Sequence, residues 1–338
     1  MLISENFCIK PFTTFGVEVR AQQFIVVSSI GDLQDLFKEG FLKTEPRMVL
    51  GRGSNVLFTD HYEGLILSCQ IRGKEIVEEN DDYVLLKVNS GEYWPGLVDE
   101  IVEKGLGGME NLCLIPGKVG AAPIQNIGAY GAEIKDVIES VEAFDMTTGT
   151  GKIFTKKECD FGYRSSIFKT KEKGRYFIVN VTFRLSKKPK LNLAYAPLKE
   201  IFQGRKEEEI TIKEVSETIK KIRNKKIPDP DSLKNAGSFF KNPVVKKKTA
   251  DKLKQQYTDM PYYPQTGNKV KLAAGWLIEQ CGWKGKRIGD VGVYDKQALI
   301  LVNYDNASGK DILQFSKKIN ASVIKKFGIH LEREVIVI

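Results

Sequence analysis

Apolar residues recur along the first 185 positions mostly in short runs that are typical of β-strands. Residues 32–39 interrupt this pattern, because Leu33, Leu36 and Phe37 fall on one side of a helix. From residue 65 to about residue 185, strand-like runs dominate. We expect strands at residues 24–27, 47–50, 65–67, 74–78, 83–88, 137–144 and 177–185.

Helical spacing of apolar residues appears in four longer segments. One of them, residues 308–327, begins with Ser308 and Asp311 at the spacing of a capping box. Another is densely charged and is ended by Pro228 and Pro230. We expect helices at residues 94–104, 205–226, 271–281 and 308–327, and a last strand at residues 334–338. The change of composition near Gly204 predicts a domain boundary there.

The chain has 338 residues, which suggests two or three domains with a substantial core. Apolar residues make up 42% and charged residues 28%, so wholesale disorder is excluded. The formal net charge of +9 favours anionic partners such as phosphates, nucleic acid or acidic lipid.

The cysteines and histidines are too few and too scattered to indicate a metal site or a disulfide framework. Five cysteines form no CxxC pair, and His61 and His330 cannot make a three-histidine site. No apolar run approaches the roughly 20 residues that span a bilayer, and the first residues lack the pattern of a signal peptide. We therefore expect a reduced, soluble, cytoplasmic protein with no metal and no membrane contact.

Lysine runs at residues 220–221, 225–226 and 246–248 raise the alternative of a nucleic-acid-binding protein. They lie beside acidic residues and lack interleaved aromatic residues or a nucleic-acid motif. A solvated helix face is the better interpretation, and we expect no nucleic-acid partner.

Two glycine-rich segments are candidates for ligand binding. Residues 51–55 (GRGSN) follow a predicted strand, where backbone amides can form an anion-binding nest, although an ordinary turn has the same composition. They match neither a Walker loop nor GxGxxG, so a nucleotide site here would not be of the Rossmann type. Residues 117–131 hold four glycines and the pair Gln125 and Asn126, which suits either close approach to a flat ligand or a tightly packed turn.

Two further segments carry candidate chemistry. Arg164 lies between an aromatic residue and two serines, which suits recognition of a carboxylate or phosphate but also describes a surface arginine. Ser238 follows Gly237 outside any GxSxG motif, so a hydrolase triad is disfavoured. A serine can still donate a proton to a carbanion, because so strong a base needs only a weak acid; the alternative is a loop serine.

Taken together, nine segments resemble the UDP-N-acetylenolpyruvoylglucosamine reductase family, the flavoenzymes of peptidoglycan precursor synthesis. Each segment alone is a weak signal, but nine in the family's order span nearly the whole chain. They are TFG (14–16), GRGSNVLF (51–58), IPGKVGAAPIQNIGAYG (115–131), YRSSIFK (163–169), KIPDP (226–230), NAGSFFKNP (235–243), KLAAGWLIEQCGWKG (271–285), QALILVN (297–303) and LEREV (331–335).

The resemblance implies an α+β fold. An FAD-binding portion in two lobes would resemble the vanillyl-alcohol-oxidase or PCMH-type flavoproteins, followed by an α/β substrate-binding domain. The lobes would be residues 1–70, joined by a terminal strand within residues 329–338, and residues 71–204. The substrate-binding domain would be residues 205–328.

The resemblance also implies a reaction in which NADPH reduces bound FAD, and the enolpyruvyl sugar nucleotide then enters the same cleft. Hydride would pass from flavin N5 to C3 of the enolpyruvyl group, and C2 would be protonated to give UDP-N-acetylmuramate. Ser238 matches the proton donor, and Arg164 and Glu334 match the residues that stabilise the enolate. A monomer is expected. Another flavin oxidase on the same fold is the alternative, distinguished by turnover with oxygen alone.

The family positions extend to the ligand-binding residues. Those matching the FAD site are Gly51, Arg52, Gly53, Ser54, Asn55, Ile115, Pro116, Gly117, Gly120, Ala121, Ile124, Gln125, Asn126 and Gly128. Those matching the substrate site are Tyr130, Tyr163, Tyr195, Lys226, Asn242, Tyr263 and Gln297, of which Tyr195 resembles the tyrosine of a loop that folds over substrate.

Overall fold

The computed structural model describes residues 2–338, and their contacts form two compact units. Unit 1 contains the residues up to Phe7 together with Ala21–Arg52 and Glu63–Arg223, and unit 2 contains Cys8–Arg20, Gly53–Tyr62 and Asn224–Ile338. This division differs from the three parts expected from the sequence. Residues 205–223 belong to unit 1, and two short N-terminal segments belong with the C-terminal part.

A four-stranded sheet in the order β1-β2-β5-β3 opens the fold. Its strands are β1 (Ile3–Cys8), β2 (Arg20–Val27), β5 (Tyr62–Cys69) and β3 (Arg47–Leu50), of which β3 and β5 are parallel. Helix α1 (Ile30–Lys38) packs Leu33 and Leu36 into the same core as residues of β2 and β5. A capping box between Ser29 and Asp32 explains why the helix begins at Ile30. The predicted helix and its neighbouring strands are confirmed.

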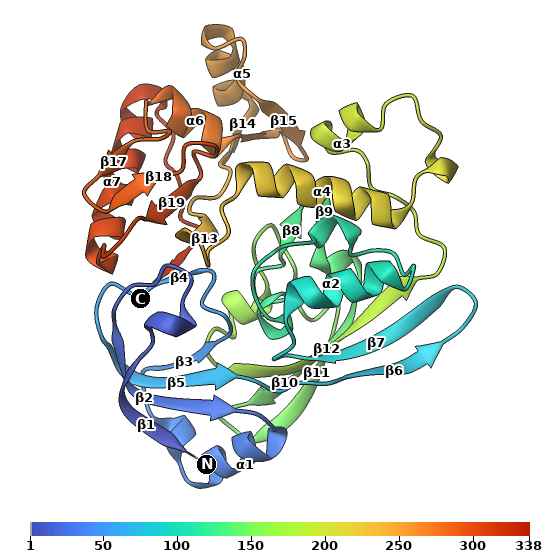
Figure 1. The fold of residues 1–338 in the computed structure, drawn as a ribbon, viewed down its shortest axis with the longest axis vertical. Coiled ribbons are helices and arrows are strands. Elements are labelled where there is room, and N and C mark those ends of the chain that lie inside the picture. The colour runs from blue at the N-terminus through green and yellow to red at the C-terminus, as the bar shows by residue number, and fades with distance from the viewer. Residues whose placement is uncertain (1) are drawn as a thin grey trace. The chain divides into compact units, whose positions relative to one another are not determined.

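An antiparallel five-stranded sheet forms the centre of unit 1. Its order is β11 (Thr150–Thr155), β10 (Ile138–Asp145), β12 (Tyr176–Ser186), β7 (Tyr83–Asn89) and β6 (Lys74–Glu79). Helix α2 (Trp94–Glu103) lies over β12 and β7 in Figure 1, and it shares a buried core with β10 and β12. Within this core the rings of Trp94 and Phe183 meet edge to face at 6.1 Å. All the strands predicted here are confirmed, whereas β11 was not predicted.

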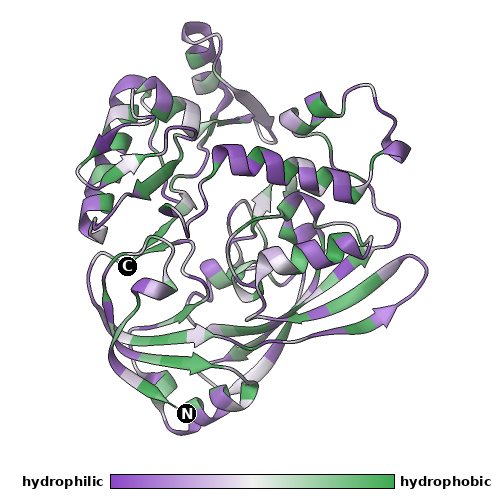
Figure 2. Cartoon of the chain, viewed as in Figure 1, coloured by the Kyte–Doolittle hydropathy of each residue, from purple (hydrophilic) through white to green (hydrophobic). Residues whose placement is uncertain are grey.

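Helix α4 (Ile212–Lys226) joins the same core through one narrow apolar face. Ile212, Val215 and Ile219 are buried among the residues of α2 and the sheet, whereas most of the helix is hydrophilic and purple in Figure 2. The predicted start at residue 205 is wrong, because residues 207–209 form a separate 3-10 turn and the apolar stripe begins only at Ile212. The predicted end before Pro228 is confirmed.

Unit 2 is built on a second sheet in the order β13 (Lys234–Ser238), β19 (Ile300–Asn303), β18 (Val291–Val293) and β17 (Arg287–Ile288). Helix α7 (Gly309–Phe327) contacts β18 and β19, and its predicted capping box is present. A small sheet of β14 (Val244–Lys246), β16 (Lys269–Leu272) and β15 (Tyr262–Gln265) carries α5 (Lys247–Gln256). Strand β20 (Ile336–Val337) pairs in parallel with β4 (Val56–Leu57).

The helix predicted at residues 271–281 begins later than expected. Leu272 and Lys271 belong to β16, where they pair with β14 and β15, and α6 (Ala274–Gln280) starts two residues on. The side chain of Asn242 accepts a hydrogen bond from the Ala274 amide at 3.0 Å, which fixes the start of the helix. Periodicity alone could not separate a short paired strand from a first helical turn.

Every helix among residues 2–338 is too short or too polar to cross a lipid bilayer. The same residues bring together no three His, Cys, Asp or Glu side chains in a way that could hold a metal ion.

Candidate functional site

The residues predicted to act in the site belong to both units, and each group is described within its own unit. Unit 1 contains the site residues from 115 to 195 together with Gly51 and Arg52. Unit 2 contains the remainder, which are Gly53, Ser54, Asn55, Lys226, Ser238, Asn242, Tyr263, Gln297 and Glu334.

The glycine-rich segment of unit 1 is largely irregular and ends in a small hairpin of β8 (Gly128–Ala129) and β9 (Ala132–Glu133). Asn126 is fully buried, and its side chain joins three neighbours of this segment. Its amide nitrogen donates to the Gly162 carbonyl at 3.0 Å and to the Glu133 carboxylate at 3.1 Å, while its oxygen accepts from the Lys135 amide. These bonds hold Asn126 at a φ of +47°, a conformation few side chains adopt.

The segment that carries Arg164 is bonded directly to the glycine-rich segment. Ser166 donates its hydroxyl to the Ile124 carbonyl at 2.6 Å, and the Arg164 guanidinium donates to the Gly128 carbonyl at 2.6 Å. With the bond from Asn126 to Gly162, three contacts join these two segments. The Arg164 backbone lies at a φ of +53°, and its guanidinium lies 5.3 Å from the centre of the Tyr163 ring. The positive charge is therefore fixed in place before any ligand binds.

Gly128 has to be a glycine for Arg164 to take this position. A Cβ atom at residue 128 would lie 2.9 Å from a nitrogen of the Arg164 guanidinium and 2.9 Å from the Ala132 carbonyl oxygen. Such contacts would force the arginine or the hairpin to move. The position of Arg164 therefore explains why the motif of residues 115–131 has a glycine at residue 128.

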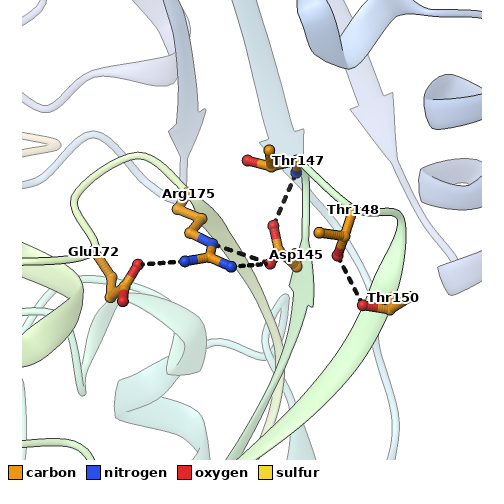
Figure 3. A network of polar contacts seen from close by, with 6 residues as sticks. All are labelled: Asp145, Thr147, Thr148, Thr150, Glu172 and Arg175. Atoms are coloured by element: carbon orange, nitrogen blue, oxygen red, sulfur yellow. Dashed lines mark hydrogen bonds and ion pairs between the residues drawn. The ribbon is translucent and has the colours of Figure 1, made fainter.

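The far end of the Arg164 segment is fixed by the polar network in Figure 3. Arg175 donates to the Asp145 carboxylate through two nitrogens, at 2.7 and 3.0 Å, and to Glu172 at 3.1 Å. Asp145 also accepts from the Thr147 amide at 2.9 Å. Burial raises the pKa of Asp145, but these hydrogen bonds outweigh it and hold the pKa below its ordinary value. The network ties the end of β10 to the residue that precedes β12.

A cluster of cations lies where the segments 51–52 and 117–120 meet. The Lys118 amine donates to the Cys69 carbonyl oxygen, and burial lowers its pKa, with smaller contributions from the positive charges of Arg72 and Arg52. Arg52 also lies 5.1 Å from the centre of the Tyr93 ring. Like charges gathered in this way suit a polyanionic ligand such as a pyrophosphate. The sequence analysis missed Lys118 and Arg72, although the position of Lys118 inside the glycine-rich segment was a usable signal.

Two of the predicted substrate-binding tyrosines are in contact. The rings of Tyr130 and Tyr195 meet edge to face at 5.3 Å, and Tyr195 directly precedes α3 (Ala196–Ile201). Burial raises the pKa of Tyr130 to about 12, so its hydroxyl stays protonated at neutral pH. Tyr195 and Tyr163 are exposed, so both rings are accessible to a ligand.

In unit 2 the structure brings Ser238, Glu334 and Asn55 to adjoining backbone positions. The Glu334 amide donates to the carbonyl of Phe239, the residue after Ser238, at 2.9 Å. The Asn55 side chain donates to the Glu334 carbonyl at 3.2 Å. Residues that are almost 100 and 280 positions apart in sequence are therefore neighbours, which the residue pattern alone could not predict.

The conformation around Ser238 leaves its side chain exposed at the end of β13. Gly237 has a φ of +69°, and its amide donates to the buried Asn235 side chain at 2.9 Å. Strand pairing resumes at Ser238, opposite Ile300, after an irregularity in the register. The turn fixes the backbone of Ser238, while its hydroxyl remains free to rotate about a single bond.

The other site residues of unit 2 lie around α6 and the small sheet. Gln297 accepts from the Leu299 amide at 3.3 Å, and a Cβ at Gly275 would lie 2.9 Å from its oxygen, so this glycine lets α6 approach closely. Asn242 holds the start of α6, while Tyr263 on β15 and Lys226 at the end of α4 are exposed.

Gly53, in the segment 51–55, is also sterically required, because a Cβ there would lie 2.3 Å from the Phe12 carbonyl oxygen.

Family models match two parts of the chain. Residues 21–156 match an FAD binding domain, and residues 229–338 match the C-terminal domain of UDP-N-acetylenolpyruvoylglucosamine reductase. A protein of that name from Flavobacterium johnsoniae is 44% identical, with full coverage of both chains. One from Neisseria gonorrhoeae is 45% identical over 96% of this chain and 94% of its own.

A solved structure shares the fold. The reductase of the same name from Thermus caldophilus has a TM-score of 0.69 at 24% identity, covering 99% of this chain and 98% of its own. Together with the two family matches, this confirms the predicted FAD-binding portion followed by a C-terminal domain.

Proposed function

Because the chain belongs to the UDP-N-acetylenolpyruvoylglucosamine reductase family, we propose that it reduces UDP-N-acetyl-3-O-(1-carboxyvinyl)-glucosamine to UDP-N-acetylmuramate. The family uses FAD with NADPH as reductant, and the chain is an oxidoreductase of this kind. When bound, FAD would supply the redox chemistry, which is acceptance of a hydride from NADPH and its delivery to the enolpyruvyl double bond. The chain's own residues bind, orient and protonate the substrate.

The residues of unit 1 fit FAD. The cations of Arg52, Arg72 and Lys118 suit its pyrophosphate, because negative charge there would relieve their mutual repulsion. The small, exposed Ala121 leaves room for a ligand to approach the backbone, whereas Gly120 is required for packing, because a Cβ there would lie 2.6 Å from the Ser90 side chain. We assign the isoalloxazine ring to Ile115, Pro116, Ile124, Gln125 and Gly128, and the pyrophosphate to residues 51–55. Asn126, which is fully buried, would serve FAD by holding this segment in shape rather than by contact.

Arg164 would hold the substrate carboxylate and stabilise negative charge as it grows there. Its guanidinium is fixed by the Gly128 carbonyl and by the neighbouring Tyr163 ring, so it needs little reorganisation when charge develops. An arginine keeps its charge at any relevant pH and offers paired donors that match a carboxylate.

Ser238 would donate the proton that C2 requires after hydride addition, and Glu334 would help Arg164 to stabilise the enolate. A serine hydroxyl is a weak acid, but the carbon it protonates is strongly basic, so position decides whether transfer occurs. The observation that most supports this assignment is the 2.9 Å hydrogen bond from the Glu334 amide to the Phe239 carbonyl. It makes the two proposed residues near neighbours across a backbone pairing.

The sugar nucleotide would be bound by Tyr130, Tyr163, Tyr195, Lys226, Asn242, Tyr263 and Gln297. In this proposal NADPH and the substrate occupy the same cleft in turn. One copy of the chain would supply every reacting residue, and we propose that it acts as a monomer. We place this activity in the cytoplasm.

The test is to follow the flavin through both halves of the reaction without oxygen. The purified protein should be yellow, should lose its colour when NADPH is added, and should regain it when the enolpyruvyl sugar nucleotide is supplied. Recovery of colour with oxygen alone, and none with the sugar nucleotide, would replace this proposal with a flavin oxidase. A colourless protein that also fails to bind added FAD would contradict both.

A further inference from the structure

Arg223, in the last turn of α4, is a half-buried cation to which residues 2–338 offer no acidic partner. Its guanidinium donates to the Leu114 carbonyl at 3.1 Å and lies beside the Tyr130 hydroxyl. Its Nε atom is buried and has no acceptor, and residues 2–338 place no carboxylate in an ion pair with it. The other charged residues of α4 mostly lie on its exposed face, as Lys221 does.

A cation in this position is unfavourable for folding by itself. Burial of an unpaired charge costs free energy, and burial lowers the pKa of Arg223. A well-packed apolar side chain of similar size would often be at least as stable. The contacts that the guanidinium makes are therefore the place to look for its role.

Those contacts fall at the two ends of one segment. That segment is residues 115–129, which contain every residue proposed above to face the isoalloxazine ring. Leu114 immediately precedes it, and Tyr130 immediately follows it. Both residues are in the left-handed conformation, with φ of +53° for Leu114 and +48° for Tyr130. Non-glycine residues hold such a conformation only where their surroundings fix it.

Neighbouring bonds complete the attachment of Tyr130. The buried Asn111 side chain donates to the Tyr130 carbonyl at 2.8 Å and to the Asn192 carbonyl at 2.9 Å. Asn111 thus holds the Tyr130 backbone, while Arg223 lies at the hydroxyl end of the same residue. A planar guanidinium with several separated donors can reach two acceptors at once, whereas a lysine amine on a flexible stem does so less well.

We propose that Arg223 is a positioning residue that fastens together the two ends of the flavin-facing segment, residues 115–129. In this role Arg223 acts through Leu114 and Tyr130, not on the reacting groups themselves. This inference rests on the proposed placement of FAD against that segment. It assigns to α4 a role in cofactor binding that its solvated, lysine-rich sequence does not indicate.

The experiment compares FAD retention and thermal stability in four full-length variants. Each purified holoprotein is diluted, and released flavin is measured by its fluorescence. For Arg223→Met we expect the dissociation constant for FAD to rise about tenfold, because a hydrogen bond from a charged donor is lost at one end of the segment. Its melting temperature, measured with FAD in excess, should stay close to that of the parent.

Arg223→Lys keeps the charge and should restore part of the affinity, with a loss of about threefold. Lys221→Met removes an exposed cation from the same helix and should change nothing. Ala121→Glu places a carboxylate at an exposed position of the segment and should abolish FAD binding if the segment faces the flavin.

Arg223→Met with parental FAD affinity, beside loss of FAD in Ala121→Glu, would overturn the role of Arg223 and leave the placement of FAD intact. Retention of FAD by Ala121→Glu would overturn the placement itself, and the inference with it. If Arg223→Met does not fold, Arg223→Lys takes its place in the test. A parental melting temperature with weakened FAD binding in Arg223→Lys then supports the proposal. A parental melting temperature together with parental FAD affinity contradicts it.

Discussion

Arg164 and Ser238 are held in the structure in contrasting ways. The Arg164 guanidinium is itself bonded, to the Gly128 carbonyl, and lies against the Tyr163 ring. Ser238 is exposed, and only its backbone is fixed, by strand pairing and by the turn at Gly237. The difference matches the two proposed tasks. A stabilising charge works best when it cannot reorganise, whereas a proton donor needs a hydroxyl that can turn toward the carbon it protonates.

The two regions also differ in what fixes their backbones. Around Arg164 the bonds come largely from side chains, such as Ser166 and Asn126, to main-chain carbonyls. Around Ser238 main-chain pairing dominates, as in the bond between Glu334 and Phe239. Substitutions near Arg164 should therefore disturb the site more often than substitutions near Ser238, where most of the bonding does not depend on side-chain identity.

The largest effect is expected for Ser238→Ala. Loss of the proton donor should lower kcat about a thousandfold, while the melting temperature stays unchanged because the side chain is exposed. Steady-state oxidation of NADPH in the presence of the sugar nucleotide measures the loss. Ser232→Ala, an exposed serine just before the same strand, is the matched control. A kcat within a few-fold of the parent would remove Ser238 from the reaction.

Arg164→Lys should be the next most damaging. The lysine keeps a positive charge but not the paired donors, so we expect kcat to fall about a hundredfold. The melting temperature should fall slightly, because the bond to the Gly128 carbonyl is lost or lengthened. Arg184→Lys is the control, because Arg184 is an exposed arginine of the same unit, and it should leave kcat unchanged. Equal activity of the two variants would show that fixed geometry at Arg164 is unimportant.

Gly128→Ala tests whether the rigid setting of Arg164 matters without changing Arg164 itself. The added methyl group would lie within 2.9 Å of the guanidinium, so the charge must shift, and we expect kcat to fall about tenfold. Gly151→Ala is the control, because a Cβ at that position meets no atom within 4 Å. Equal kcat values for both variants would indicate that the arginine adapts freely.

The smallest effect concerns the network in Figure 3. Asp145 has a pKa below its ordinary value, so its bonds stabilise the fold above about pH 4 and this contribution is lost as the pH falls through the lowered pKa. Asp145→Asn should lower the free energy of unfolding at pH 7 by about 1 kcal/mol, a figure reduced because Arg175 is partly exposed.

Urea unfolding at several pH values measures this difference, which should shrink toward about pH 3. Asp160→Asn removes one side of an exposed ion pair in the same segment and should have little effect at any pH. A difference for Asp145→Asn that stays constant or grows as the pH falls would contradict the assigned sign.

The sequence predicted most of the regular elements, because their apolar spacing agrees with their packing. Helix α7 is the clearest case, since both its capping box and its buried face could be read from the residues. Strand β14 is three residues long and partly exposed, so it left no pattern to recognise. Helix α4 was predicted to begin too early, at residue 205, because residues 205–211 are as densely charged as the helix that follows them.

The candidate site was less accessible to the same reasoning. Residue types and spacing marked Arg164 and Ser238 as candidates, but only family resemblance brought Glu334 to them. Arg223 was missed because it lies among many charged residues of one helix, and only the burial of its Nε atom distinguishes it. Lys118 was passed over within a segment where the glycines drew attention.

The central claim is that Ser238 acts only in the second half of the reaction, in which reduced flavin is reoxidised by the sugar nucleotide, and not in flavin reduction by NADPH. The most direct measurement follows the flavin absorbance of Ser238→Ala by stopped flow, first with NADPH and then, on the reduced protein, with the enolpyruvyl sugar nucleotide. The account predicts flavin reduction at the parental rate and reoxidation slowed about a thousandfold. Equal slowing of the two steps, or parental rates in both, would contradict it.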